Sequence, residues 1–302
     1  MIRLPEGIPA LDVLRDEGVK ATSFRLRDWH EELEAHSERV LLLNLMPMKA
    51  VTELDIARMM AQTGKDVVLL PVKIKGQTYK TTPMEHMRRF YVDIEDVMAA
   101  VASPSSLRLI VTGAPVEQYA FEEVRYWNEL CRIMDWAEEK HIHTLYICWG
   151  AQAALYHHYG IPKYPLPEKR FGIFEQEVLE DDCPLLRGMS PSFPMPNSRH
   201  TEVRREDFRS SDLRIVAEGK ESGAGVAVNA ARHATYIVGH LEYEPHTLEN
   251  EYRRDLSKGL PIHIPEHYYA EDNPRGEILF QWAEAACRFY TNWLELPLNV
   301  ER

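Results

Sequence analysis

The chain has 302 residues, of which 45% are hydrophobic and 27% charged, as is ordinary for a globular protein. Its net charge of −12 at pH 7 disfavours nucleic acids and anionic membranes as partners. No segment is apolar for long enough to span a bilayer, and the N-terminus MIRLPEGIPA does not have the pattern of a signal peptide.

The cysteines are scattered and none forms a CxxC pair; they are Cys131, Cys148, Cys183 and Cys287. This spacing argues against a zinc ribbon or a disulfide framework and favours a reducing cytoplasm. No spacing of histidines and carboxylates is typical of a metal site, so we expect no metal.

In chain order, short apolar runs alternate with helical patterns, after a polar lead-in over residues 1–36 that has an isolated helical stretch and no clear core. The expected strands are 39–45, 66–74, 108–112 and 145–147, and the expected helices are 52–62, 84–90, 121–140 and 151–159. Thr52 is expected to cap the first of these helices. The alternation predicts a doubly wound α/β fold, with a mostly parallel sheet covered by helices on both faces.

From about residue 171 the pattern changes to strands with little helix between them. The expected strands are 171–179, 214–218, 225–230 and 234–239, and helices return at 247–258 and 276–294. These strands predict an antiparallel extension of the same sheet in the C-terminal half. There is no internal repeat, low-complexity tract or flexible linker, so we expect residues 1–302 to form a single catalytic domain, with 1–36 packed on its core.

The stretch Thr144–Leu155, TLYICWGAQAAL, places a cysteine between a strand and a helix. Leu145–Ile147 is typical of a buried strand, and the alanine-rich residues after Gly150 favour a helix. A cysteine on that turn lies at the carboxyl end of a sheet, where the helix N-terminus favours a thiolate. The next N–H can face a developing oxyanion, so the pattern indicates a nucleophile. This stretch alone leaves a buried structural cysteine as an equal alternative.

A histidine and a carboxylate follow a later predicted strand. His240 and Glu242 are two residues apart, so on an extended backbone they face the same side. The carboxylate can hold one imidazole nitrogen while the other serves a nucleophile. His-x-Glu alone is a weak indication of a catalytic site. Together with Cys148, it gives a nucleophile, a base and an acid in that order along the chain. Two more strand ends, Asn44–Lys49 and Thr112–Gln118, carry unusual residues at the edge where such sheets bind ligands.

Several long stretches carry a resemblance to a known family. They are IRLPEGIPA, LLLNLMPMKAVTE, TPMEHMRRFY, IVTGAPVEQYAFEEVRYW, LYICWGAQAALYHHYGIPK, NSRH and VGHLEYEPHTLENEYRRD. Over nearly the whole chain, the sequence resembles the homoserine transacetylases and transsuccinylases of methionine biosynthesis. The resemblance implies a flavodoxin-like fold of the class I glutamine amidotransferase kind. Where family members often have His-Pro-Glu, this chain has His240-Leu241-Glu242, with the histidine and the acid intact.

The resemblance also implies a reaction and its residues. An acyl group passes from acyl-CoA to Cys148 and then to the hydroxyl of L-homoserine, with His240 as base, Glu242 as its orienting acid and no bound cofactor. The residues implied for the amino-acid substrate are Lys169, Ser198 and Arg254. Lys49, by its place at a strand end, is a candidate for oxyanion support together with the N–H of Trp149. Arg199, beside Ser198, is a further candidate for the substrate carboxylate. Without the resemblance, Lys169 and Arg254 would be interpreted as solvated surface charges.

Glu117 makes acetyl-CoA the expected donor. The resemblance puts this position beside the acyl chain, where transsuccinylases typically have Gly and transacetylases Glu. A Glu side chain fills the space that a succinyl group needs and faces its carboxylate with a like charge. At about 4 Å and an effective dielectric near 20, the repulsion is on the order of 4 kcal/mol. The alternative is an ordinary exposed loop carboxylate.

Other functions remain open at this stage. Succinyl-CoA could replace acetyl-CoA, and L-serine, one methylene shorter, could replace homoserine. The same Cys-His-Glu arrangement also serves glutamine amidotransferases and peptidases, and a non-catalytic sensor could retain the pocket. From the family we expect a homodimer.

Overall fold

The structure is a computed structural model that describes residues 1–101 and 106–298. In this part of the chain one sheet holds the strands in the order β2-β1-β4-β3-β6-β7-β12-β11-β10-β8-β9, with β5 beside β4. The strands are β1 Ile2–Pro5, β2 Ala21–Phe24, β3 Glu38–Leu43, β4 Val67–Lys73, β5 Val92–Asp93, β6 Leu107–Val111, β7 His143–Ile147, β8 Tyr164–Val178, β9 Ser192–Glu202, β10 Arg214–Gly219, β11 Gly223–Asn229 and β12 Ala234–Ile237. The helices are α1 Pro9–Asp16, α2 Trp29–Glu34, α3 Lys49–Gln62, α4 Met84–Phe90, α5 Ile94–Ala100, α6 Trp127–Glu139, α7 Trp149–Tyr159, α8 Thr247–Ser257 and α9 Ala283–Glu295.

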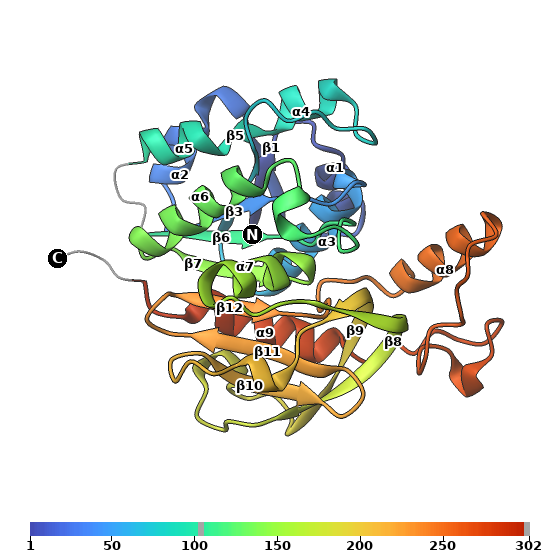
Figure 1. The fold of residues 1–302 in the computed structure, drawn as a ribbon. Helices are drawn as coiled ribbons and strands as arrows, with labels where there is room; N and C mark the ends of the chain where they lie inside the picture. Colours follow the sequence, from blue (N-terminus) through green and yellow to red (C-terminus); the bar gives the residue numbers. More distant parts are fainter. Residues whose placement is uncertain (102–105, 299–302) are drawn as a thin grey trace.

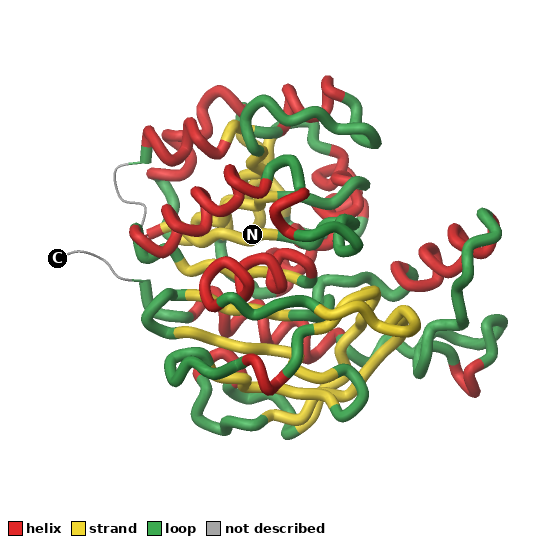
Figure 2. The backbone as a smooth tube through the Cα atoms, viewed as in Figure 1, coloured by secondary structure: helices red, strands yellow, loops and turns green. Residues whose placement is uncertain are grey.

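The predicted fold class is confirmed. From β2 to β12 the neighbouring strands are parallel, and from β12 to β9 they are antiparallel. Figure 1 shows the parallel half with its helices above and the antiparallel strands below. Figure 2 shows helices on both sides of the sheet.

Alternate residues of the central strands enter two separate cores. Val40 and Leu42 of β3 pack with α1, α3 and α9, whereas Leu41 and Leu43 pack with α5, α6 and α7. Both faces of the parallel half are therefore covered, which explains why its strands are continuous apolar runs. Among the described residues, no helix combines the length and the hydropathy that a membrane crossing requires.

The expectation that residues 1–36 are a lead-in without a clear core is wrong. β1 pairs with β2 and β4, so this segment supplies two strands of the sheet itself. Ile2, Leu4, Leu11 and Leu14 are buried in the core that α3 and α9 share. Strands of four residues are too short to give a clear alternation in the sequence, which is why the pattern was missed.

Two helix boundaries also differ from the prediction. α3 begins at Lys49, so Thr52 lies buried within the helix and does not cap it. The helix expected over 121–140 is interrupted: a short 3-10 turn, Phe121–Glu123, precedes α6. The Glu123 carboxylate accepts a hydrogen bond from the Ala120 N–H at 3.0 Å, which stabilises that separate turn.

β9 was not expected, because Pro194 and Pro196 lie within it. The strand pairs with β8 on one side and ends the sheet on the other. The Pro196 carbonyl accepts the His240 N–H at 2.8 Å, so it points away from β8. The N–H positions of residues 194 and 196 therefore face the free edge, where a proline disrupts no ladder hydrogen bond.

Arg108 of β6 joins the sheet to the end of α9. Its side chain is 2% exposed and donates to the carbonyls of Trp293 at 3.0 Å, Leu294 at 2.6 Å and Leu296 at 2.8 Å. The last carbonyls of a helix have no partner within the helix. Arg108 satisfies them from the neighbouring strand and so fixes α9 against the sheet.

Replacing Arg108 should therefore destabilise the fold. We expect Arg108→Met to lower the free energy of unfolding by on the order of 3 kcal/mol, because buried carbonyls lose charged donors. Urea denaturation measures the change. Arg132→Met is the control, since Arg132 is 71% exposed and its substitution should change stability by less than about 0.5 kcal/mol. Equal losses in the two variants would contradict this role for Arg108.

Candidate active site

Cys148 lies on a strained turn between β7 and α7. Its backbone has φ 52° and ψ −116°, a conformation that residues other than glycine rarely adopt. Its N–H donates to the Ile237 carbonyl of β12 at 2.8 Å. A Cβ atom on Gly150 would lie 2.7 Å from the Thr112 carbonyl oxygen, so only glycine allows α7 to start this close to β6. The central strands thus hold the turn and present Cys148 at their carboxyl ends.

His240 and Glu242 meet as expected, although not by the expected backbone geometry. β12 ends at Ile237, and both residues lie in the turns that follow it. His240 Nδ1 lies 2.7 Å from Glu242 Oε1, and the imidazole is hydrogen-bonded to the Cys148 side chain. The Tyr243 ring stacks on the imidazole with ring centroids 4.1 Å apart. The three predicted catalytic side chains therefore form one connected chain.

The charges around His240 favour its protonated form. Burial alone would lower the pKa of His240, but the charges of Cys148 and Glu242, and hydrogen bonds to both, hold it well above its usual value. An imidazole held between a cysteine and a carboxylate is the arrangement found where a cysteine acts as a nucleophile.

Lys169, Ser198 and Arg254 come together around a carboxylate that the sequence did not indicate. The Glu251 carboxylate accepts from Lys169 Nζ at 2.7 Å, Ser198 Oγ at 2.8 Å and Arg254 Nη2 at 3.2 Å. Burial by itself would raise the pKa of Glu251, but Lys169 and Ser198 outweigh burial and lower it, so the group stays charged. Polar side chains from β8, β9 and α8 thus meet at the Glu251 carboxylate.

Glu251 could have been found from one local signal. It lies three residues before Arg254, so both face the same side of α8. A surface ion pair explains that spacing equally well, which is why it did not single out Glu251.

Glu117 faces the same region from the loop after β6. It is half-buried, and its Oε1 accepts the His200 N–H from the free edge of β9 at 3.1 Å. Burial raises the pKa of Glu117, while the charges of His200, Lys169 and Arg199 oppose the rise. Glu117 is therefore not an exposed loop carboxylate in this structure.

The oxyanion candidates differ in how they are held. Trp149 is the first residue of α7, where a backbone N–H has no acceptor within the helix. Lys49 Nζ donates to the carbonyls of Asn44 at 2.6 Å and Met46 at 3.1 Å and lies 4.7 Å from the centre of the Tyr79 ring. Burial lowers the pKa of Lys49 to about 8, against the charge of Glu53.

Arg199 does not take the role suggested for it. Adjacent residues of a strand face opposite sides, so Arg199 points away from Ser198. Its guanidinium is buried and donates to Asn197, Thr201 and Ser222. Because Nε, Nη1 and Nη2 all donate to the protein itself, Arg199 has no free pair of N–H groups for a substrate carboxylate.

Asp55 is a second carboxyl beside His240 that the sequence did not indicate. It belongs to α3, is 5% exposed, and its neighbours include Glu242, Glu244 and Arg58. Burial, with the negative charges of Glu242 and Glu244, raises the pKa of Asp55 to about 8. Asp55 is therefore largely protonated at neutral pH, and Glu242 carries the charge beside His240.

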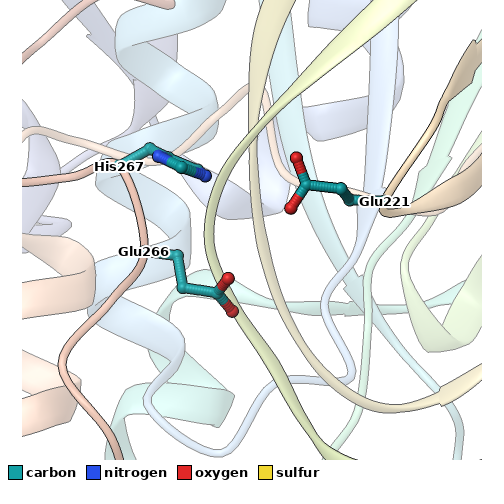
Figure 3. Close-up of side chains that lie close together, drawn as sticks. All are labelled: Glu221, Glu266 and His267. Atoms are coloured by element: carbon teal, nitrogen blue, oxygen red, sulfur yellow. The ribbon is translucent and has the colours of Figure 1, made fainter.

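Figure 3 shows a separate group of side chains, Glu221, Glu266 and His267, whose ligand atoms lie within 4.8 Å of one another. Sequence spacing could not indicate it, because Glu221 precedes the other two by more than forty residues. Glu221 and His267 are exposed, and exposed acidic groups are common without an ion. The group does not support a metal assignment.

Comparison with solved structures places the fold. A glutamine amidotransferase from Thermotoga maritima aligns over 86% of this chain and 97% of its own, with a TM-score of 0.55 and 16% sequence identity. The protein thus has the class I glutamine amidotransferase fold. The sequence profile of the family described as homoserine O-succinyltransferase matches residues 1–299, and the chain belongs to that family of acyl-transferring enzymes.

Two relatives are similar over nearly their full length. A protein of Bacteroides thetaiotaomicron is 44% identical over 312 residues, which cover 99% of this chain and 98% of that protein. A protein of Parabacteroides distasonis is 44% identical over 301 residues, covering 99% and 95%. Both are named homoserine O-acetyltransferase.

The buried carboxyl of Asp55 should make stability depend on pH. The folded protein holds its proton up to about pH 8, whereas the unfolded chain releases it near the ordinary value of 3.8. The folded state therefore binds more protons between these values, and stability falls as the pH rises through them. Asp55→Asn keeps the hydrogen on the side chain, so we expect it to be more stable than the parent by over about 1 kcal/mol at pH 8.

Urea denaturation at about pH 5 and pH 8 measures this difference, which should be larger at the higher pH. Asp96→Asn is the matched control, because Asp96 is exposed on the surface helix α5. A stability difference for Asp55→Asn that is the same at both pH values would show that its carboxyl titrates normally.

Proposed function

We propose that the protein transfers an acetyl group from acetyl-CoA to the hydroxyl of L-homoserine, through a thioester on Cys148. The observation that carries the proposal is the connected chain of Cys148, His240 and Glu242. Tyr243, which stacks on His240, lies within electrostatic reach of both Cys148 and Glu251. Membership of the family and the names of the relatives support the same reaction.

In the first half-reaction the Cys148 thiolate attacks the thioester carbonyl of acetyl-CoA. The N–H of Trp149 stabilises the oxyanion, and the Lys49 ammonium adds positive charge on the same edge of the sheet. His240 gives its proton to the departing sulfur of coenzyme A, and the acetyl group stays on Cys148. His240 is then neutral and is held by Glu242 in the orientation of a base.

In the second half-reaction His240 takes the proton of the homoserine hydroxyl, and the alkoxide attacks the Cys148 thioester. Homoserine is a zwitterion, and the cluster offers both charges that it needs. The Glu251 carboxylate suits the ammonium. Arg254 donates Nε and Nη2 to Asp255 at 2.6 and 2.9 Å, which leaves Nη1 of this half-exposed guanidinium for the substrate carboxylate. Lys169 and Ser198 orient Glu251 between them. A thioester-to-ester transfer is downhill, so the reaction needs no metal or bound cofactor.

Glu117 supports acetyl as the acyl group, although the family as a whole carries the name of succinyl transfer. The side chain bonds to the His200 N–H of β9, and the family resemblance implies a position beside the acyl chain, where its carboxyl group would meet the second carboxylate of succinyl. Because the pKa of Glu117 is raised, its charge grows as the pH increases. Discrimination against succinyl-CoA should therefore contain a steric part and a charge part that increases with pH.

The covalent intermediate can be tested by intact mass. We expect the protein to gain the mass of one acetyl group when acetyl-CoA is added without acceptor, and to lose it when L-homoserine follows. Cys148→Ala should abolish both the label and turnover, whereas Cys183→Ala is the control for a buried thiol outside the site. A label that maps to another cysteine, or ammonia release from glutamine in place of acyl transfer, would contradict the proposal.

The donor preference can be tested at Glu117 with two substitutions. Glu117→Gly removes bulk and charge, and we expect kcat/KM for succinyl-CoA relative to acetyl-CoA to rise by at least about tenfold. Glu117→Gln keeps the bulk, so it should remove only the pH-dependent part of the discrimination. If the parent already prefers succinyl-CoA, or if the ratio is unchanged in the Gly variant, Glu117 does not select the donor.

A further inference from the structure

A cationic pocket lies beside the candidate active site. It has a volume of about 260 Å³ and is formed by segments 43–49, 73–81, 115–116 and 125–126, at the carboxyl ends of β3, β4 and β6. Its charged lining residues are Lys49, Lys73, Lys80 and Arg125, and no carboxylate lines it. The whole chain carries a net charge of −12, so this local excess of positive charge opposes the overall balance.

Two of the four cations are free to meet a ligand. Lys49 is held by backbone carbonyls, and Lys73 is paired with Asp93. Lys80 and Arg125 are exposed, and neither makes a hydrogen bond or an ion pair with any residue that the structure describes. They come from separate loops, one after β4 and one before α6, and both line the same pocket.

Only one loop separates this pocket from the nucleophile. Pro115 and Val116 line the pocket and lead directly to Glu117. On the other side of the same loop, a Cβ atom on Gly113 would lie 3.3 Å from Cys148 Cβ. The Tyr126 ring, also in the pocket, contacts the Trp149 ring at a centroid distance of 6.3 Å. The pocket therefore lies one residue layer from Cys148, beside the end of β6.

We propose that this pocket binds the coenzyme A part of the acyl donor, with Lys80 and Arg125 at its phosphates; the inference rests on the proposed function. Coenzyme A joins a phosphorylated nucleotide to a long, weakly polar arm that ends at the thioester. Phosphates prefer guanidinium and ammonium partners, and the pocket also has apolar lining residues, among them Leu45, Pro115 and Val116, which suit the arm.

The assignment separates the two substrates in space. The pocket is built on β3, β4 and β6, on one side of β7 in the sheet order, whereas Lys169 and Ser198 belong to β8 and β9 on the other. Donor and acceptor thus approach Cys148 from different sides, and coenzyme A need not cross the homoserine cluster to leave.

Acetyl-pantetheine tests the pocket because it carries the same thioester and arm without phosphates. We expect the double variant Lys80→Ala/Arg125→Ala to raise KM for acetyl-CoA by about tenfold or more, with kcat little changed. KM for acetyl-pantetheine and for L-homoserine should stay at the parent value. Lys220→Ala, which removes an equally exposed cation near β10 and β11, is the matched control and should change none of them.

The outcomes separate this inference from the proposed function. If the KM of the double variant for acetyl-CoA equals that of the parent, the phosphates do not bind Lys80 and Arg125. The same follows if its KM rises equally for acetyl-CoA and acetyl-pantetheine. In both cases, turnover of acetyl-CoA still supports acyl transfer. If the parent forms no ester from acetyl-CoA, the proposed function fails. Calorimetric titration with free coenzyme A then still tests the pocket, because equal affinity of parent and double variant overturns the inference.

Discussion

The strained backbone of Cys148 is the constraint on which the site depends. A positive φ at a residue with a side chain costs on the order of 1–3 kcal/mol, and the surrounding strands must hold it. They do so from two sides, through the Cys148 N–H bond to Ile237 and the close approach of Gly150 to Thr112. Because Ile237 is also the last residue of β12, the same contact fixes where the chain leaves the sheet toward His240.

Around that turn, the buried negative and positive groups lie in different places. Beside the imidazole lie two carboxyl groups, Glu242 and Asp55, and burial keeps Asp55 largely protonated at neutral pH. On the side of Cys148, the buried Arg199 guanidinium lies within electrostatic reach of the sulfur. Negative charge therefore lies beside the His240 imidazole, and a buried positive charge lies near Cys148, within one acidic protein.

Much of the fold and of the catalytic chain could be predicted because the signals are local. Buried parallel strands are continuous apolar runs, and the strand, turn and helix around Cys148 can be predicted from the twelve consecutive residues 144–155. β9 was missed because its prolines are acceptable only at a sheet edge, a fact that no local pattern contains. Asp55 and Glu251 were missed for a related reason, since each becomes functional only through partners that the fold brings from distant segments.

The free edge of β9 has a further consequence, for association between chains. An uncovered edge of this length invites another strand to add to the sheet, which is how many proteins aggregate. Here Pro194 and Pro196 offer no donors, the Pro196 carbonyl is taken by His240, and the His200 N–H is taken by Glu117. The contacts that assemble the site thus also oppose strand addition, so one short stretch of backbone both holds the candidate site and protects the sheet edge.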